Sequence, residues 1–141
     1  MRRTLRGWCL LGILSIATMV LLAVARPAQP SSPRRIQMGL ASFYGPGFHG
    51  EETASGEIFD QREMVAAHRS LPFGTIVRVT NLENKRAAVV RVIDRGPYGR
   101  NVRKGAIIDV SRGVAKELGF VRDGLVRVRV EVVKLPEESG S

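Results

Sequence analysis

Cysteine is almost absent from this chain. The only one, Cys9, directly follows Trp8 and lies too close to the start to be a lipid-attachment cysteine. Beyond residue 25 no cysteine remains. An exported chain of this kind cannot be a small disulfide-stabilised scaffold, so its stability must come from an apolar core.

Several motifs of specialised chemistry are missing as well. The sequence has no HxH, HExxH or CxxC spacing, although His49, His68, Glu57 and Asp94 are all residue types that bind metals. It has neither a glycine-rich phosphate loop nor a G-x-S-x-G nucleophile turn. We therefore expect no metal and no other cofactor.

The one long apolar run lies at the N-terminus. Residues 1–6 carry three arginines and no acid, residues 8–22 are mostly apolar, and Ala23 and Ala25 form the small-x-small pattern that a signal peptidase reads. This pattern predicts a signal peptide over residues 1–25, and hence an exported protein of the periplasm or cell wall without a stable membrane anchor. The alternative is an uncleaved anchor, although a run of about fifteen residues is short for a membrane span of roughly 20.

Acidic side chains are outnumbered in the rest of the chain. The 116 residues after position 25 make up one domain's worth of sequence and carry 19 basic and 13 acidic residues, a net charge of +6. This excess favours anionic partners, which outside the cytoplasm are cell-wall polymers or membrane surfaces rather than nucleic acid. The alternative is a generic basic surface that aids solubility. A basic nucleic-acid-binding barrel would become attractive only if residues 1–25 were not a signal peptide.

The composition divides the chain after the predicted signal peptide into three parts. Residues 26–36 are rich in proline and serine and predict a flexible linker. Residues 37–135 form the folded domain, and residues 136–141 form a polar tail. No internal repeat is evident, and we expect a monomer.

Most patterns within the domain are typical of β-strands. Residues 75–80 and 87–93 are β-branched runs joined by the turn-forming segment NLENKR, and residues 125–133 alternate apolar and charged side chains. Residues 39–44 and 106–110 are shorter candidates. Many short strands separated by glycine and proline turns predict a mainly β fold, a small β-barrel whose closure removes exposed strand edges.

Helix signals are few. Asp60 followed by Glu63 resembles a capping pair and predicts a short helix over residues 64–67, with His68 at its end. Residues 111–118 form a second helical stretch, which Gly119 ends.

Three ionisable side chains of the kinds that transfer protons lie in turn-rich sequence. Glu57 leaves a glycine turn beside apolar neighbours, so partial desolvation would raise its pKa as a general acid requires; the alternative is a solvated loop glutamate. Asp94 ends an apolar strand, where rigid scaffolds present reactive groups. His68 is either catalytic or a packed or capping histidine.

Two neighbouring residues leave alternatives open. Arg95 either lowers the pKa of Asp94 and holds it ionised or is a surface charge that points elsewhere. Asp109 is a second carboxylate at a strand end, but its place just before Ser111 makes helix capping the simpler explanation.

The segments together resemble the rare lipoprotein A family. The resemblance covers essentially all of residues 39–133, in order, and its motifs are long enough to be specific. They are GLASFYG (39–45), FHG (48–50), TASGEIFD (53–60), AAHRSLPFGTIVRVTNLEN (66–84), VRVIDRGPYG (90–99) and IIDVS (107–111), followed by a helix that ends in LG (118–119).

The resemblance implies a fold and an activity. It implies a six-stranded double-psi β-barrel with one or two short helices. It also implies an endolytic lytic transglycosylase of peptidoglycan, which cleaves between N-acetylmuramic acid and N-acetylglucosamine, leaves a 1,6-anhydro end and prefers glycan strands stripped of stem peptides. The leading alternative is a non-catalytic wall-binding or wall-loosening module of the expansin kind.

The resemblance also implies site residues. The family's functional glutamate, histidine and aspartate fall on Glu57, His68 and Asp94, and the IIDVS aspartate matches a position used in expansin barrels, which makes Asp109 the reserve acid. We assign the proton transfer to Asp94 or Glu57, and His68 to orienting a carboxylate or a substrate hydroxyl. Substrate binding is assigned to Tyr44, Thr53, Ser55 and Arg95.

The sequence departs from the family pattern in three places. It lacks the lipobox cysteine and a C-terminal glycan-binding repeat domain, so neither lipid anchoring nor septal targeting is expected. The segment GRNVRKGA (99–106) is longer and more basic than usual and could reshape one wall of the groove.

Overall fold

The computed structural model describes residues 35–137. The predicted signal peptide, nearly all of the linker and the end of the polar tail lie outside these residues. The described elements are β1 (Ile36–Phe43), the 3₁₀ helix η1 (Pro46–Phe48), β2 (Val65–His68), β3 (Ile76–Asn81), β4 (Ala87–Asp94), α1 (Gly99–Arg103), β5 (Ala106–Val110), α2 (Arg112–Leu118) and β6 (Val126–Lys134).

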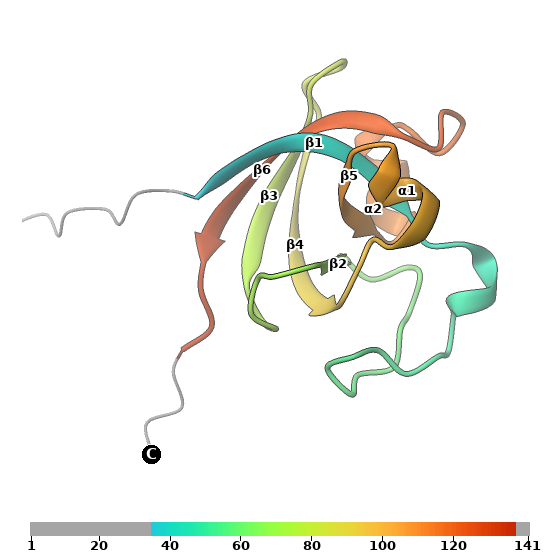
Figure 1. Cartoon of the computed structure of the whole chain (residues 1–141), viewed down its shortest axis with the longest axis vertical. Helices are drawn as coiled ribbons and strands as arrows, with labels where there is room; N and C mark the ends of the chain where they lie inside the picture. Colours follow the sequence, from blue (N-terminus) through green and yellow to red (C-terminus); the bar gives the residue numbers. More distant parts are fainter. Residues whose placement is uncertain (1–34, 138–141) are drawn as a thin grey trace, which may run out of the picture. The chain divides into compact units, whose positions relative to one another are not determined.

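The six strands close into a barrel in the order β1-β5-β2-β4-β3-β6 (Figure 1). The pairs β1–β5 and β2–β4 are parallel, and the remaining pairs, including the closing pair β1–β6, are antiparallel. Closure leaves no strand of the ring with an unpaired edge. The prediction of a mainly β, six-stranded double-psi barrel is therefore confirmed.

The hairpin between β3 and β4 and the long strand β6 confirm the alternation seen in the sequence. Most of their valines point into the barrel interior and the residues between them face outward, because side chains of a strand point to opposite faces with a period of two. The turn also supports a neighbouring element, since the amides of Asn81 and Asn84 both donate to the carbonyl of Leu118 at the end of α2.

The helix predicted over residues 64–67 is wrong, because this segment is the strand β2. All four of its residues are buried between β4 and β5. The carboxylate of Asp60 does not cap a helix there: it accepts hydrogen bonds from the backbone and side chain of Arg62. Pairing on both sides of β2 outweighs a weak local capping signal.

The second predicted helix is confirmed as α2. The side chain of Ser111 accepts a hydrogen bond from the backbone N–H of Val114, and Gly119 ends the helix in the left-handed conformation. Asp109 plays no part in this cap and belongs to β5, so the capping explanation for Asp109 is wrong. The basic segment after residue 98 forms the short helix α1, which the sequence analysis did not predict.

Two apolar clusters position the site. The larger fills the barrel interior and includes Val77, Val92, Ile108 and Val128. The smaller one consists of Tyr44, Phe59, Val65, Ala67 and Ile93. Its strand residues alternate with those of the interior cluster, so it lies against the outer surface of the wall. The long loop between β1 and β2 runs outside the ring of strands and contributes Phe59 to this outer cluster (Figure 1).

Candidate functional site

Asp94 ends β4 on the outer surface of the barrel, beside the outer apolar cluster. Its Oδ2 accepts a hydrogen bond of 2.5 Å from the hydroxyl of Tyr44. Its Oδ1 accepts two more, from the backbone N–H of Ala54 at 2.9 Å and of Arg95 at 2.8 Å. Three donors from three different segments therefore fix the orientation of this carboxylate.

Tyr44 is a neutral donor to this carboxylate. Burial raises the pKa of its phenol far above the usual value, and the hydrogen bond to Asp94 and the negative charges of Asp94 and Asp109 raise it further. The hydroxyl consequently keeps its proton across the whole physiological range.

Asp109 is the carboxyl whose environment favours the protonated form. Burial raises its pKa to about 6, a hydrogen bond from the Ser42 hydroxyl at 3.4 Å acts in the opposite direction, and the charge of Asp94 raises the pKa further. A carboxyl with a pKa near 6 holds its proton much closer to neutral pH than an ordinary aspartate does, which is the property of a general acid.

The strand register brings the two aspartates together. Ala67 of β2 is paired with Asp94 on β4 and with Asp109 on β5, so the aspartates flank it from the two neighbouring strands. Two strand spacings put their Cα atoms about 10 Å apart. The side chain of Ala67 between them is itself buried in the outer apolar cluster.

Glu57 lies on the loop beside the two aspartates. Its pKa is shifted in the opposite direction from that of Asp109. Its carboxylate accepts a 2.6 Å ion-pair hydrogen bond from Arg91, and its side chain is 46% exposed. Arg91 lowers the pKa of Glu57, and the Ser55 hydroxyl lowers it as well, although slight burial acts against them. The expectation of a raised pKa for Glu57 is therefore wrong, because Arg91 outweighs the effect of desolvation.

Thr53 and Ser55 hold the loop that carries Glu57. The Thr53 hydroxyl donates to the carbonyl of Glu57 at 2.8 Å and contacts the Ser55 hydroxyl at 3.0 Å. The backbone N–H of Ser55 donates to the carbonyl of Ile93, which ties the loop to β4 directly before Asp94. Their assignment to substrate binding stays a prediction.

His68 does not join the carboxylates. Its Nδ1 accepts from the backbone N–H groups of Ser70 and Leu71, so Nε2 carries the proton and donates to Gln37 at 2.9 Å. Burial lowers its pKa, and the charge of Arg95 lowers it further. His68 follows Ala67 and is paired with Ile108 of the interior cluster, so its side chain points to the opposite face of β2 from the aspartates.

The side chain of Arg95 contacts other residues of the protein. Its guanidinium donates to the carbonyls of His68 and Leu71 and lies 3.9 Å above the centre of the Phe73 ring. It therefore anchors the connection between β2 and β3. Its assignment to substrate binding stays a prediction, and it would require breaking these contacts.

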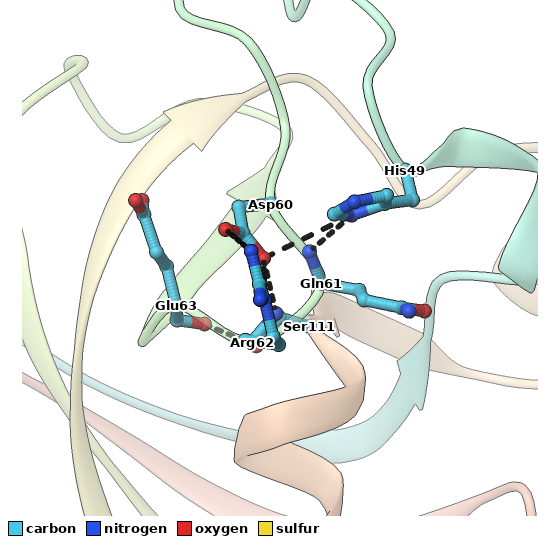
Figure 2. Close-up of polar contacts among 6 residues, drawn as sticks. All are labelled: His49, Asp60, Gln61, Arg62, Glu63 and Ser111. Atoms are coloured by element: carbon cyan, nitrogen blue, oxygen red, sulfur yellow. Dashed lines mark hydrogen bonds and ion pairs between the residues drawn. The ribbon is translucent and has the colours of Figure 1, made fainter.

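A polar cluster that the sequence analysis missed anchors the long loop to α2 (Figure 2). Arg62 holds the pKa of Asp60 down at about 2, and His49 accepts a hydrogen bond from the backbone N–H of Gln61. At the helix, the Ser111 hydroxyl donates to the carbonyl of Glu63. The loop and the start of α2 are thus one connected unit.

Ser42, Ala67 and Arg91 were also not identified in advance. Ser42 lies on β1 and Tyr44 directly follows this strand, so the alternation of side chains places both on the outer face, but nothing in the sequence paired Ser42 with Asp109. Within residues 35–137, no three histidine, cysteine, aspartate or glutamate side chains gather as metal ligands. No helix in this part of the chain is long and apolar enough to cross a membrane.

Comparison with solved structures supports the barrel alone. A Streptomyces papain inhibitor aligns with a TM-score of 0.55 and 21% identity over 71% of this chain and 96% of that one. The expansin of Clavibacter michiganensis aligns with a TM-score of 0.54 and 21% identity over 74% of this chain and 53% of that one.

Sequence comparison is more specific. Relatives named endolytic peptidoglycan transglycosylase RlpA include one from Campylobacter jejuni, 48% identical over 95 residues, which covers 67% of this chain and 33% of that protein. A probable one from Aquifex aeolicus is 41% identical over 141 residues, or 95% of this chain and 60% of that protein. The chain therefore spans from about a third to three fifths of these two relatives. The profile of the family described as "Lytic transglycolase" matches residues 36–130. The chain belongs to this RlpA-like family of double-psi barrel lytic transglycolases.

Proposed function

We propose that the protein is an endolytic lytic transglycosylase of peptidoglycan that acts in the cell envelope. It would cleave the bond between N-acetylmuramic acid and N-acetylglucosamine and leave a 1,6-anhydro end. Family membership and the names of the relatives support the reaction class. The single observation that carries the chemistry is the pair of aspartates around Ala67, of which Asp109 has a pKa raised to about 6.

In the proposed mechanism Asp109 is the acid. Its proton passes to the glycosidic oxygen, the bond from that oxygen to C1 of muramic acid breaks, and N-acetylglucosamine leaves with a free hydroxyl. The 6-hydroxyl of the same muramic acid attacks C1 and returns its proton to the Asp109 carboxylate. Because the nucleophile belongs to the substrate, one carboxyl serves as acid and then as base, and no water is consumed.

The other residues support this step. The carboxylate of Asp94, held by Tyr44 and two backbone N–H groups, faces the positive charge that develops on the sugar ring. Glu57 is held by Arg91 as a carboxylate and belongs to the electrostatics of the loop rather than to proton donation. This assignment gives the acid role to the aspartate first held in reserve, and His68 supports the scaffold from the other face of β2.

Finer properties follow from the family resemblance and belong to the same proposal. They are export to the periplasm or cell wall, a monomeric state and a preference for glycan strands stripped of stem peptides. The basic charge of the chain suits an anionic wall polymer.

The test is product analysis. Purified residues 26–141, incubated with peptidoglycan, should release fragments with 1,6-anhydro ends that mass spectrometry identifies. Asp109→Asn and Asp94→Asn should each lower the rate by roughly 10²–10⁴. Glu57→Gln should also lower activity, but less than Asp109→Asn. Wild-type turnover in a folded Asp109→Asn protein would overturn the acid assignment.

The expansin-like alternative is a module that binds the wall without cleaving it. It is favoured by one observation, the shared fold of a Clavibacter expansin that was solved in complex with cellohexaose. Binding to peptidoglycan without any anhydro product would support this alternative.

A further inference from the structure

Two aromatic side chains are exposed beside the aspartate pair. Of the aromatic residues between positions 35 and 137, five are buried or partly buried, whereas Phe48 is 54% and Tyr98 64% exposed. Neither ring contributes to the two apolar clusters. Exposed rings on a rigid frame are a binding surface when they lie together at a site.

Phe48 lies on the loop side of Asp94. Its ring meets the edge of the Tyr44 ring at a centroid distance of 5.5 Å and an angle of 71°, and the hydroxyl of Tyr44 is bonded to Asp94. The helix η1 and the hydrogen bond from the N–H of Glu51 to the carbonyl of Phe48 hold its backbone. The ring of Phe48 is thus connected to Asp94 through one intervening side chain, that of Tyr44.

Tyr98 lies four residues after Asp94, on the segment between β4 and α1. A Cβ atom placed on Gly96 would lie 3.7 Å from two ring carbons of Tyr98 and 3.6 Å from the Cβ of Ala67. The ring of Tyr98 and the methyl group of Ala67 therefore approach the same point above Gly96. Because Ala67 separates Asp94 from Asp109, this approach brings Tyr98 close to the aspartate pair.

We infer that Phe48 and Tyr98 are stacking platforms for sugar rings of a glycan strand bound at the aspartate pair. A pyranose ring offers a face of C–H groups, and these carry the partial positive charge that the negative face of an aromatic ring attracts. An aromatic ring also supplies a large contact area with few rotatable bonds, so little entropy is lost on binding. The inference rests on the proposed function for the identity of the ligand, a β-1,4-linked amino-sugar glycan.

The two platforms would set the register of the strand. Sugars stacked on Phe48 and Tyr98 would hold the strand against the surface that carries Asp94 and Asp109. Stacking on the faces of the sugar rings makes no contact with the stem-peptide positions, so the glycan alone determines binding at these two subsites.

The test is direct binding of peptide-free glycan strands by calorimetry, with Asp109→Asn as the parent protein so that the ligand is not consumed. Phe48→Ala and Tyr98→Ala should each weaken binding about tenfold or more. Tyr98→Phe keeps the ring and should stay within twofold of the parent. Met38→Ala, an exposed apolar truncation on β1 away from the site, is the matched control and should also stay within twofold.

Kinetics separate this inference from the proposed function. In the active protein, Phe48→Ala and Tyr98→Ala should raise KM more than they lower kcat. If the protein forms anhydro products but both alanine variants keep the parental affinity and KM, the platforms are refuted and the proposed reaction stands. If no anhydro product forms but glycan binding depends on both rings, the proposed reaction fails and the platforms stand. Absence of glycan binding in the parent protein refutes the platforms.

Discussion

At the scale of single residues, the site is built from groups of the same chemistry in different surroundings. Asp94, Asp109 and Glu57 are all carboxyl groups, yet one is fixed by three donors, one is buried with a raised pKa, and one is ion-paired at the surface with a lowered pKa. Such separation of pKa values is what divides acid and base roles between similar side chains.

The raised pKa of Asp109 has a consequence for stability. Its pKa lies near 3.8 in the unfolded chain and about 6 in the fold, so the ionised form destabilises the fold. The stabilising contribution of protonated Asp109 to folding is fully present below pH 3.8 and is lost as pH rises through 6. At pH 7, Asp109→Asn should therefore increase the free energy of unfolding by roughly 2 kcal/mol while it abolishes activity.

Urea denaturation at pH 7 and pH 4 measures this effect. The gain should shrink at pH 4, where wild-type Asp109 is itself mostly neutral. Asp123→Asn, on an exposed turn, is the control and should change stability little at either pH. A loss of stability at pH 7 in Asp109→Asn would contradict the assigned environment.

The ion pair of Glu57 predicts a titration change. Replacing Arg91 by methionine removes the cause that lowers the pKa most, so the pKa of Glu57 should rise toward its ordinary value. NMR titration of the Glu57 carboxyl carbon follows this shift. Because the pair is largely exposed, the variant should lose no more than about 1 kcal/mol of stability. An unchanged titration curve would show that the pair does not form in solution.

At the scale of elements, the loop between β1 and β2 and the helix α2 support each other. Ser111 caps α2 and also donates to Glu63, while the N–H of Gly113 donates to the carbonyl of Gln61. Through this docking, α2 supports the same loop that carries Phe48, Glu57 and Phe59. The site residues on this loop therefore depend on contacts in which none of the site's carboxyl groups takes part.

Gly113→Ala tests this docking of the loop on α2. Helix propensity and the close contact at this position predict opposite changes in the free energy of unfolding. Helix propensity alone would stabilise the protein by up to about 1 kcal/mol. However, a Cβ at Gly113 would lie 2.8 Å from the carbonyl oxygen of Arg62, and backbone cannot move aside as a side chain can. We expect a net loss of about 1–3 kcal/mol and lower activity. Thermal unfolding measures it, with Lys116→Ala on the exposed face of α2 as the control.

At the scale of the whole molecule, stability rests on the interior of the barrel. Val128 is fully buried on β6 and lies opposite residues of both β1 and β3. Val128→Ala should cost about 2–3 kcal/mol of unfolding free energy, through lost apolar burial and the cavity that remains. Val89→Ala, exposed on β4, should cost less than about 0.5 kcal/mol. Equal losses in urea denaturation would contradict the interior assignment.

Local sequence patterns predicted the alternating strands, the hairpin between β3 and β4 and the helix α2, although not its serine cap, and the family motifs predicted the barrel. These features depend on local periodicity and turn chemistry, which neighbouring residues carry. The sequence also singled out Asp94 and kept Asp109 in reserve.

The proposal that Asp109 is the acid rests on surroundings that only the folded chain creates. Burial, strand pairing and contacts between distant residues determine a pKa, and none of them is a local property of the chain. The same reason explains why residues 64–67 are a strand, why His68 points away from the aspartates and why Arg91, fixed on a barrel strand, holds Glu57 ionised. The register that places Ala67 between Asp94 and Asp109 exists only once three strands, far apart in sequence, have paired.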